Sequence, residues 1–404
     1  MRKMSLSKVK RELLRLGRQT RAAPRVAWEY CTLTIRYDIM AARQRNVHTG
    51  DRALAGEVAV YLIFPSKGIL ASHLDMLRQL NAHDISPILV SNLPLSQKDL
   101  AILKPLCTRI IERPNIGYDF GGYRDGILNL AGDLPKFDRL YLLNDSCWMI
   151  DASSSWFEMV RDANTDFCAA SAHEGLRNPD PHDYRNFVWT YKTDGPRFHY
   201  ASYALSVSNR ILRDPEFSRF WRKFRLSDSK SVNIRRGEVG LTQWMLRRNC
   251  YSHTATCPLD NLDQEISGLD NDELDAVARN LVISSIRNLR ITRDKILKIP
   301  ACSREGRFDR IQIILTAVRS EGLSYVMPFY TSRYRGFQFV KKSPIWLSRG
   351  GSDTMIALLD SLPGPMVRHA AHEARTLRPG AWPMPATDAK TSSEKDGQEH
   401  ASSD

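Results

Sequence analysis

The sequence predicts an α/β protein: a mostly parallel sheet flanked by helices, with a basic N-terminal helix and a mixed, largely helical C-terminal region. Between residues 52 and 150, apolar runs of strand length alternate with segments whose leucines recur at helical spacing. The 404 residues are 42% hydrophobic and 25% charged, which supplies a sizeable core and excludes a wholly disordered chain. No run approaches the roughly eighteen apolar residues of a membrane-spanning helix.

The first predicted unit, residues 1–51, is distinguished by its charge. Residues 1–50 hold twelve Lys or Arg against three Asp or Glu, and so carry nine of the thirteen net positive charges. Within them, apolar and basic residues repeat at helical spacing on adjoining faces: Leu6, Val9, Leu13 and Leu16, and Lys8, Arg11, Arg15 and Arg18. Such a helix can lie on an anionic membrane, pack on the protein as a solvated helix, or bind nucleic acid.

We expect the first of these, contact with the inner face of the cell membrane through residues 1–45. No nucleic-acid partner is expected, because the chain has no recognisable motif for one. Leu13 and Leu14 are followed by Arg15 and Arg18, so no secretory apolar region forms. The seven cysteines include no Cys-x-x-Cys pair, which disfavours a zinc ribbon. The predicted location is therefore cytoplasmic and peripheral at the membrane.

The second predicted unit, residues 52–255, carries the alternating elements. We expect strands at 57–64, 85–90, 108–112 and 140–143, and helices over 70–80, 96–103 and 123–130. Ligands of such sheets bind beyond the carboxyl ends of the strands, so the residues just after each strand are the candidates for a site.

The remainder of the chain is mixed. Alternating aromatic residues from Phe187 to Tyr200, interrupted by a Thr-Asp-Gly-Pro turn, predict a hairpin, whose rings suit either a sheet core or a sugar-stacking wall. Helices are expected at 210–224, 241–248, 273–288 and 309–319. Residues 256–370 form a third unit, and residues 371–404, poor in aliphatic side chains, a disordered tail.

The densest functional signal is the glycine-rich segment 113–126, which follows a strand and opens a helix. Its glycines let a ligand approach the backbone, and a helix N-terminus attracts an anion. Asn115 can read a base or a ribose, Asp119 can accept hydrogen bonds from hydroxyls, and Arg124 can pair with a phosphate. The alternative is a turn that only packs the helix against the sheet.

Two carboxylates further along are candidates for chemistry. Asp145 follows the strand at 140–143, where it can hold Mg²⁺ or Mn²⁺ on a diphosphate, or simply cap a turn. Glu238 precedes an amphipathic helix, where it can act as a general base, or simply favour the helix dipole.

Taken in order, these segments resemble the rhamnan synthesis protein F family of bacterial glycosyltransferase-like proteins. The resemblance runs from Val58 to about Cys250 and is carried by Val90-Ser91-Asn92, the block Arg-Pro-Asn-Ile-Gly-Tyr-Asp-Phe-Gly-Gly-Tyr-Arg, Leu-Leu-Asn-Asp-Ser, His199-Tyr200, Phe-Ser-Arg-Phe-Trp and Glu-Val-Gly-Leu.

That family is similar to GT-A-type glycosyltransferases, which implies a GT-A-like domain over 52–255 and a nucleotide-sugar donor. By position, Asp145 is the implied metal ligand and Glu238 the implied base. The nucleotide-sugar site would take Asn92, Asn115, Gly117, Asp119, Arg124 and Asn144. The sequence departs from the family pattern at Asn144-Asp145-Ser146, where a second carboxylate is missing.

The resemblance thus implies a nucleotide-sugar-dependent transferase of the hexosyl type that moves a sugar, with rhamnose the first candidate. The acceptor would be a growing cell-surface polysaccharide, including lipopolysaccharide, or a lipid-linked glycan. The alternative is a non-catalytic glycan-binding or scaffold partner of a polysaccharide assembly complex, which the missing second carboxylate favours.

Overall fold

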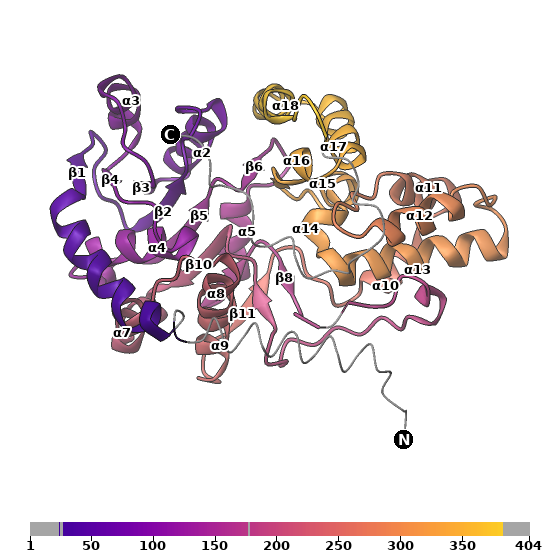
Figure 1. The fold of residues 1–404 in the computed structure, drawn as a ribbon, viewed down its shortest axis with the longest axis horizontal. Coiled ribbons are helices and arrows are strands. Elements are labelled where there is room, and N and C mark those ends of the chain that lie inside the picture. The colour runs from indigo at the N-terminus through magenta and orange to yellow at the C-terminus, as the bar shows by residue number, and fades with distance from the viewer. Residues whose placement is uncertain (1–23, 25–26, 177, 383–404) are drawn as a thin grey trace.

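A single eight-stranded sheet organises the protein. The structure is a computed structural model that describes residue 24, residues 27–176 and residues 178–382. Along the sheet the order is β1-β4-β3-β2-β5-β10-β7-β11 (Figure 1). The strands are β1 (Asn46–Thr49), β2 (Glu57–Ile63), β3 (Ile85–Ser91), β4 (Arg109–Glu112), β5 (Arg139–Asn144), β7 (Phe167–Ala169), β10 (Ala204–Ser208) and β11 (His253–Ala255).

The centre of the sheet is parallel. β4, β3, β2 and β5 are neighbours that all run in the same direction, whereas β1 and β10 pair antiparallel with β4 and β5 at its two borders. Almost every residue of β2, β3 and β5 is buried, because helices cover both faces and leave no polar side to these strands. The predicted mostly parallel α/β sheet is confirmed.

Two hydrophobic clusters lie on opposite faces of the sheet. One packs Tyr61 and Leu89 against α2 (Ala71–Ala82), α3 (Gln97–Leu103) and α5 (Trp156–Ala163). The other packs Val60 and Val90 against α4 (Tyr118–Asn129), α6 (Asn209–Leu212), α7 (Pro215–Lys223), α9 (Gly240–Leu246) and a helix over 27–44. Neighbouring residues of one strand thus face different layers, as the strand repeat of two requires.

The C-terminal region continues the first of these clusters as far as Phe339, and its last three helices pack with Trp148 and Ile150 in a third cluster. β12 (Phe339–Lys341) pairs antiparallel with β6 (Cys147–Met149), and the helices around it gather on one side of the sheet (Figure 1). Those helices are α10 (Leu262–Gly268), α11 (Asn271–Arg279), α12 (Arg287–Ile296), α13 (Arg304–Glu321), α14 (Leu323–Val326), α15 (Pro328–Tyr334), α16 (Pro344–Leu347), α17 (Arg349–Ser361) and α18 (Pro365–Leu377). The first cluster therefore contains residues from both sides of residue 255.

Three sequence predictions are wrong in detail. β9 (His199–Tyr200) pairs with β8 (Ala172–His173), so the hairpin predicted from the alternating aromatics does not form. The helix predicted at 210–224 is two helices, because Asp214 caps a new helix that begins at Pro215. The predicted helix at 273–288 is interrupted: α11 ends at Arg279, residues 280–286 are not helical, and residues 287–288 begin α12.

The two ends of the chain lie partly outside the description. α18 extends to Leu377, so residues 371–377 are helical and the predicted tail begins too early; residues 383–404 lie outside the described residues. The amphipathic pattern of residues 6–18 also lies outside them. In the described part of the chain, no helix combines the length and apolarity needed to cross a bilayer.

Candidate active site

The strand order reverses between β2 and β5. The chain adds β3 and then β4 on one side of β2 and afterwards places β5 on the other, which makes the β2–β5 border a topological switch point. Open α/β sheets bind their ligands in the crevice beyond the carboxyl ends of the strands at such a border. Phe64 and Asp145 are the first residues after β2 and β5.

Asp145 is held at this border by both neighbours. Its Oδ2 accepts a hydrogen bond from the Phe64 backbone N–H at 2.8 Å, and His73 Nε2 lies 3.3 Å away without making a regular hydrogen bond. Burial works against ionisation, but His73, the charge of Lys342 and the Phe64 hydrogen bond together hold the pKa of Asp145 below its ordinary value. Asp145 is therefore an anion at the switch point.

Asp119 lies beside it, in the first turn of α4. It accepts a hydrogen bond from Asn144 Nδ2 at 3.1 Å, and Asn144 Oδ1 accepts from Ser146 Oγ at 2.6 Å. Burial first, and then the negative charges of Asp145 and Glu238, raise the pKa of Asp119 to about 6. The structure thus brings Asn144, Asp145, Asp119 and Glu238 into one electrostatically coupled site.

Glu238 reaches this site from a widened turn. Residues Arg235–Val239 form a π-helical turn between α8 (Lys230–Ile234) and α9, a feature that is frequent at functional sites. The Oε1 atom of Glu238 accepts hydrogen bonds from the hydroxyl and, at 3.1 Å, from the backbone N–H of Ser202. Its second oxygen makes no hydrogen bond to a described residue, which leaves it available to a ligand.

Lys341 completes the site from the C-terminal region. Its Nζ donates to Ser146 Oγ at 3.2 Å and lies 4.2 Å from the centre of the Tyr203 ring. Burial opposes its charge, yet the ionisable groups around it, Cys147 and Tyr325 and then Glu238 and Asp119, raise its pKa above the ordinary value. The sequence analysis missed this residue, because nothing in the pair Lys341-Lys342 connects it with segments about two hundred residues earlier.

The loop from 113 to 117 is organised by Arg113. Its guanidinium, 3% exposed, donates to Asp125 Oδ2 at 2.7 Å, to Tyr37 Oη at 2.9 Å, and to Asn92 Oδ1 and the carbonyl of Ile116. The Asn92 side chain is thereby bound inside the protein. One residue thus ties the end of β3, the loop, α4 and the 27–44 helix together.

The other loop candidates differ in placement. Gly117 caps α4 in a left-handed conformation with φ 85°, and a Cβ there would lie 2.5 Å from the Leu226 side chain. α4 therefore begins at Tyr118, five residues before the predicted helix. Asn115 is exposed. Arg124 is buried, with its guanidinium on the Asp38 carboxylate at 2.7 and 2.9 Å, so the structure does not bring it into the site.

The described residues contain no group of three or more His, Cys, Asp or Glu side chains arranged to hold a metal ion. Asp145 nevertheless offers an ionised oxygen, and the raised pKa of Asp119 reflects negative charge that an added cation would relieve. Magnesium sites often use one or two carboxylates together with the phosphates of the substrate. Asp145 fits a cation of that kind, which a bound diphosphate would largely hold.

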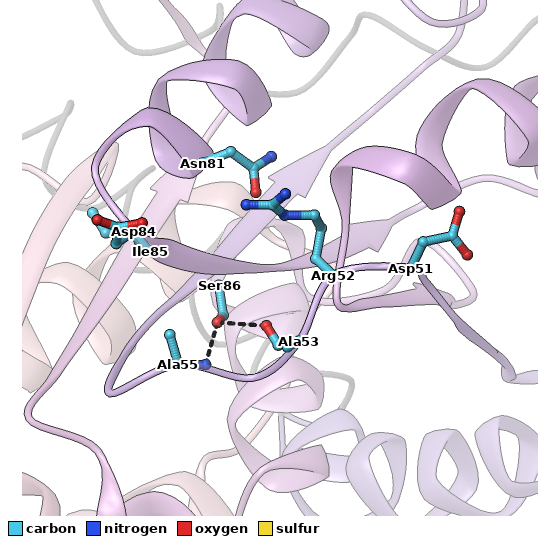
Figure 2. Close-up of a pocket in the computed structure, with 8 residues that line it drawn as sticks. All are labelled: Asp51, Arg52, Ala53, Ala55, Asn81, Asp84, Ile85 and Ser86. Atoms are coloured by element: carbon cyan, nitrogen blue, oxygen red, sulfur yellow. Dashed lines mark hydrogen bonds between the residues drawn. The ribbon is translucent and has the colours of Figure 1, made fainter.

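A separate hollow of about 320 Å³ lies at the other end of the strands. Figure 2 shows its lining, in which Arg52 and Asn81 face one another and Ser86 Oγ accepts from Ala55 N at 2.6 Å. Ile85 and Ser86 begin β3, so this hollow lies at the amino ends of the parallel strands. The site and this hollow are therefore on opposite edges of the sheet.

Comparison with known proteins agrees with the resemblance seen in the sequence. Residues 87–271 match the family model of rhamnan synthesis protein F. The match begins in β3 and includes Asn92, the loop at 113–117, Asp145 and Glu238, but neither β2 nor Lys341.

A curated relative and several solved structures, of which three are described, are similar to this chain. An uncharacterized protein, y4gN, from Sinorhizobium fredii is 29% identical over 238 residues, which cover 59% of this chain and 58% of the relative. This chain therefore matches little more than half the length of that relative. Among solved structures, core-mannan synthase A from Aspergillus fumigatus in its Mn/GDP form is 9% identical, covering 44% of this chain and 65% of that one, with a TM-score of 0.26.

The other two are mannosyltransferases. Ktr4p from S. cerevisiae is 9% identical over 45% of this chain and 63% of its own, with a TM-score of 0.23. PcManGT from Pyrobaculum calidifontis, solved with GDP-Man and Mn²⁺, is 11% identical over 88% and 90%, with a TM-score of 0.29.

Proposed function

We propose that this protein is a glycosyltransferase that moves a sugar from a nucleotide-diphosphate donor to a growing cell-surface polysaccharide, such as lipopolysaccharide, or to a lipid-linked glycan. The observation that supports it best is the meeting of Asp145, Asp119 and Glu238 beyond the carboxyl ends of β2 and β5. The match to the rhamnan synthesis family makes rhamnose the first sugar to test.

In this proposal the diphosphate of the donor lies between Asp145 and Lys341. Asp145 would hold a divalent cation, Mn²⁺ or Mg²⁺, which neutralises the negative charge that develops on the diphosphate as it leaves. Lys341, the last residue of β12, supplies a second positive charge; β12 pairs with β6, which follows Asp145 in the chain. Arg124 takes no part, because Asp38 holds its guanidinium.

Glu238 acts as the general base. Its free oxygen accepts the proton of the acceptor hydroxyl, while Ser202 fixes the other oxygen and so keeps the carboxylate oriented. Asp119 and Asn144, joined by their hydrogen bond, would accept and donate hydrogen bonds to the donor sugar or ribose. In this proposal Asp145 holds the metal ion, Lys341 adds a positive charge, and Glu238 is the base, all on the same substrate.

The test is a thermal-shift screen of the full chain with nucleotide diphosphates and nucleotide sugars, with and without Mn²⁺, followed by a transfer assay with the sugar that binds. A ligand at about a hundred times its dissociation constant adds roughly 2.7 kcal/mol of stability. We expect a shift that depends on Mn²⁺ and is lost in Asp145→Asn. Transfer should be lost in Glu238→Gln, while Asp162→Asn, an exposed carboxylate of α5, is the matched control.

The second candidate is a non-catalytic glycan-binding or scaffold protein. It is favoured by the missing second carboxylate in the sequence element Asn144-Asp145-Ser146, and by the hydrogen bonds that Asn92 and Arg124 make inside the protein. A flat response to every nucleotide together with glycan binding would support it. Normal transfer by Asp145→Asn and Glu238→Gln would exclude the assigned chemistry.

We also propose contact with the inner face of the cell membrane through residues 1–45. In its described part, the helix over 27–44 exposes Trp28, Ile35 and Ile39, which are 66%, 56% and 56% exposed. Arg36 and Arg43 are exposed on the same helix. Exposed apolar and basic side chains on one helix are suited to an anionic membrane surface. Deletion of residues 1–45 should abolish binding to anionic vesicles.

A further inference from the structure

A second hollow, of about 590 Å³, lies on the face of the sheet that carries α4 and α7. Three elements line it: the 27–44 helix, α7 with the two residues after it, and the segment from the π-helical turn to α9. Its lining residues are Tyr30, Glu216, Arg219, Phe220, Lys223, Phe224, Arg225, Arg236 and Trp244. None of them belongs to the candidate active site.

The charge of this hollow is strongly positive. Four of its lining residues are Lys or Arg, against one carboxylate, Glu216, which pairs with Arg219 at 2.8 Å. Among the described residues, no carboxylate lies within ion-pair distance of the other three, Lys223, Arg225 and Arg236, and the charge of Glu29 acts on Arg236 only from farther away. Positive charges gathered around a cavity repel one another, and an anion in the cavity relieves that repulsion.

Two of these cations are held in place rather than free in solvent. The guanidinium groups of Arg225 and Arg236 lie 5.7 and 5.0 Å from the centre of the Tyr30 ring. Arg236 Nη1 also donates to the carbonyls of Arg225 and Leu226, at 3.1 and 3.3 Å. Arginines that are already oriented lose less side-chain entropy when they bind an anion, and their planar groups suit the oxygens of a phosphate.

The walls of the hollow are aromatic. Phe220 and Trp244 have ring centres 6.1 Å apart, and Phe224 stacks on Phe120 of α4 at 5.7 Å. Aromatic faces pack against sugar rings and hydrocarbon, whereas a small inorganic anion makes no apolar contact with them. The combination therefore indicates an organic ligand with a phosphate at one end.

We propose that this hollow is a binding site for the phosphate or diphosphate group of an organic ligand, distinct from the donor site. The shared chemistry has two sources, the headgroup of a lipid at the membrane surface and a soluble phosphorylated compound. The proposal does not depend on the proposed transfer reaction, because it uses none of the residues assigned there.

The test compares two double variants of the full chain that lose the same charge. Lys223→Gln with Arg225→Gln removes two cations of the hollow, whereas Arg213→Gln with Arg222→Gln removes two exposed cations that do not line it. Binding of inorganic pyrophosphate is measured by titration calorimetry without a divalent cation, because the proposed donor site depends on one to hold a diphosphate. Binding to vesicles is measured by flotation, with phosphatidylcholine alone or mixed with phosphatidylglycerol.

We expect wild type and control to bind pyrophosphate alike and the hollow variant to bind it at least about tenfold more weakly. If vesicle binding falls in parallel, the source is a lipid headgroup. If only pyrophosphate binding falls, the source is a soluble phosphorylated compound. Equal losses in both double variants, or no pyrophosphate binding by wild type, would overturn the proposal.

The basic N-terminal residues can bind vesicles by themselves, and the comparison of the two double variants cancels that contribution because both keep those residues. If the hollow variant fails to fold, Lys223→Gln alone is compared with Arg222→Gln alone, since Lys223 ends α7 and does not touch the Tyr30 ring. Donor binding, measured in the same variants, should not change.

Discussion

Asp119→Asn should make the protein more stable at neutral pH while impairing the site. Burial and the charges of Asp145 and Glu238 raise the pKa of Asp119 from 3.8 to about 6. The folded protein therefore binds this proton more tightly than the unfolded chain does. The stability that protonated Asp119 contributes is present below about pH 4 and is lost as the pH rises through about 6.

The size of the effect follows from that shift. At 1.36 kcal/mol per unit, it corresponds to about 3 kcal/mol, and we expect about half of it because Asp119 is partly exposed and relaxes in solvent. An unfolding entropy of about 2.1 cal/mol/K per residue then gives a rise in melting temperature of about 2 °C for 404 residues. The amide keeps an oxygen for the Asn144 hydrogen bond.

The assay is a melting series on wild type, Asp119→Asn and the control Asp162→Asn, from about pH 4 to pH 7.5. The gain of Asp119→Asn over wild type should grow with pH and level off above about pH 7, while the control follows wild type. A variant that is less stable at pH 7.5, or a gain that does not change with pH, would refute the assigned electrostatics. Donor binding by the same variant should weaken, because the predicted hydrogen-bond acceptor loses its charge.

Three further outcomes are expected. Arg113→Met removes the guanidinium that lies 2.7 Å from the buried Asp125 and leaves only the longer ion-pair contact with Arg124, at 3.8 Å. Urea denaturation should therefore show a loss of about 3 kcal/mol, against less than about 1 kcal/mol for the surface pair broken in Arg279→Met; equal losses would contradict it. In Gly237→Ala the new Cβ would lie 2.3 Å from the Phe120 ring, which stacks on Trp221. We expect the free energy of unfolding, measured by urea denaturation, to fall by about 1–3 kcal/mol. In the control Gly132→Ala the new Cβ meets nothing within 4 Å, so its stability should be nearly unchanged. Lys341→Met should fold but bind a nucleotide diphosphate more weakly in calorimetry, because the diphosphate loses a charged hydrogen-bond donor. The exposed control Lys98→Met should bind it as wild type does, and undiminished binding by Lys341→Met would remove Lys341 from the proposed site.

The sheet could be predicted because its strands leave little choice. β2, β3 and β5 are short, almost wholly apolar runs that end in polar or turn-forming residues, and burial on both faces is what such runs favour. Helix boundaries were harder to predict. α4 begins at Tyr118 because Gly117 adopts a left-handed conformation, and a glycine can do that at many positions in a sequence.

The aromatic hairpin failed for a different reason. Phe187 and Trp189 alternate as strand residues do, but the guanidinium of Arg319 lies over both rings, at 5.7 and 5.0 Å from their centres. They pack on α13, a helix more than a hundred residues later, and no strand partner is needed. A period of two shows that alternate side chains are buried, but it does not show what buries them.

In the candidate site, too, the sequence indicates which residues could take part in chemistry but does not show which partners they bind in the fold. Asp145, Asp119 and Glu238 could be chosen from the sequence because each carboxylate stands at an element end. Asn92 and Arg124 were chosen on equally good chemical grounds, yet the structure gives their polar atoms to Arg113 and Asp38.

The partners that the sequence did not reveal come from the N-terminal helix and the C-terminal region, whose positions the strand pattern does not predict. Asp38 and Tyr37 come from the N-terminal helix, and they bind Arg124 and Arg113, which withdraws one predicted phosphate ligand and fixes the glycine-rich loop. Lys341 comes from the C-terminal region and adds a cation beside Asp145 and Asp119. The N-terminal helix and the C-terminal region therefore determine which cations the site contains, although its three carboxylates, Asp119, Asp145 and Glu238, all lie in the segment between them. The motifs of that segment alone could not show this contribution.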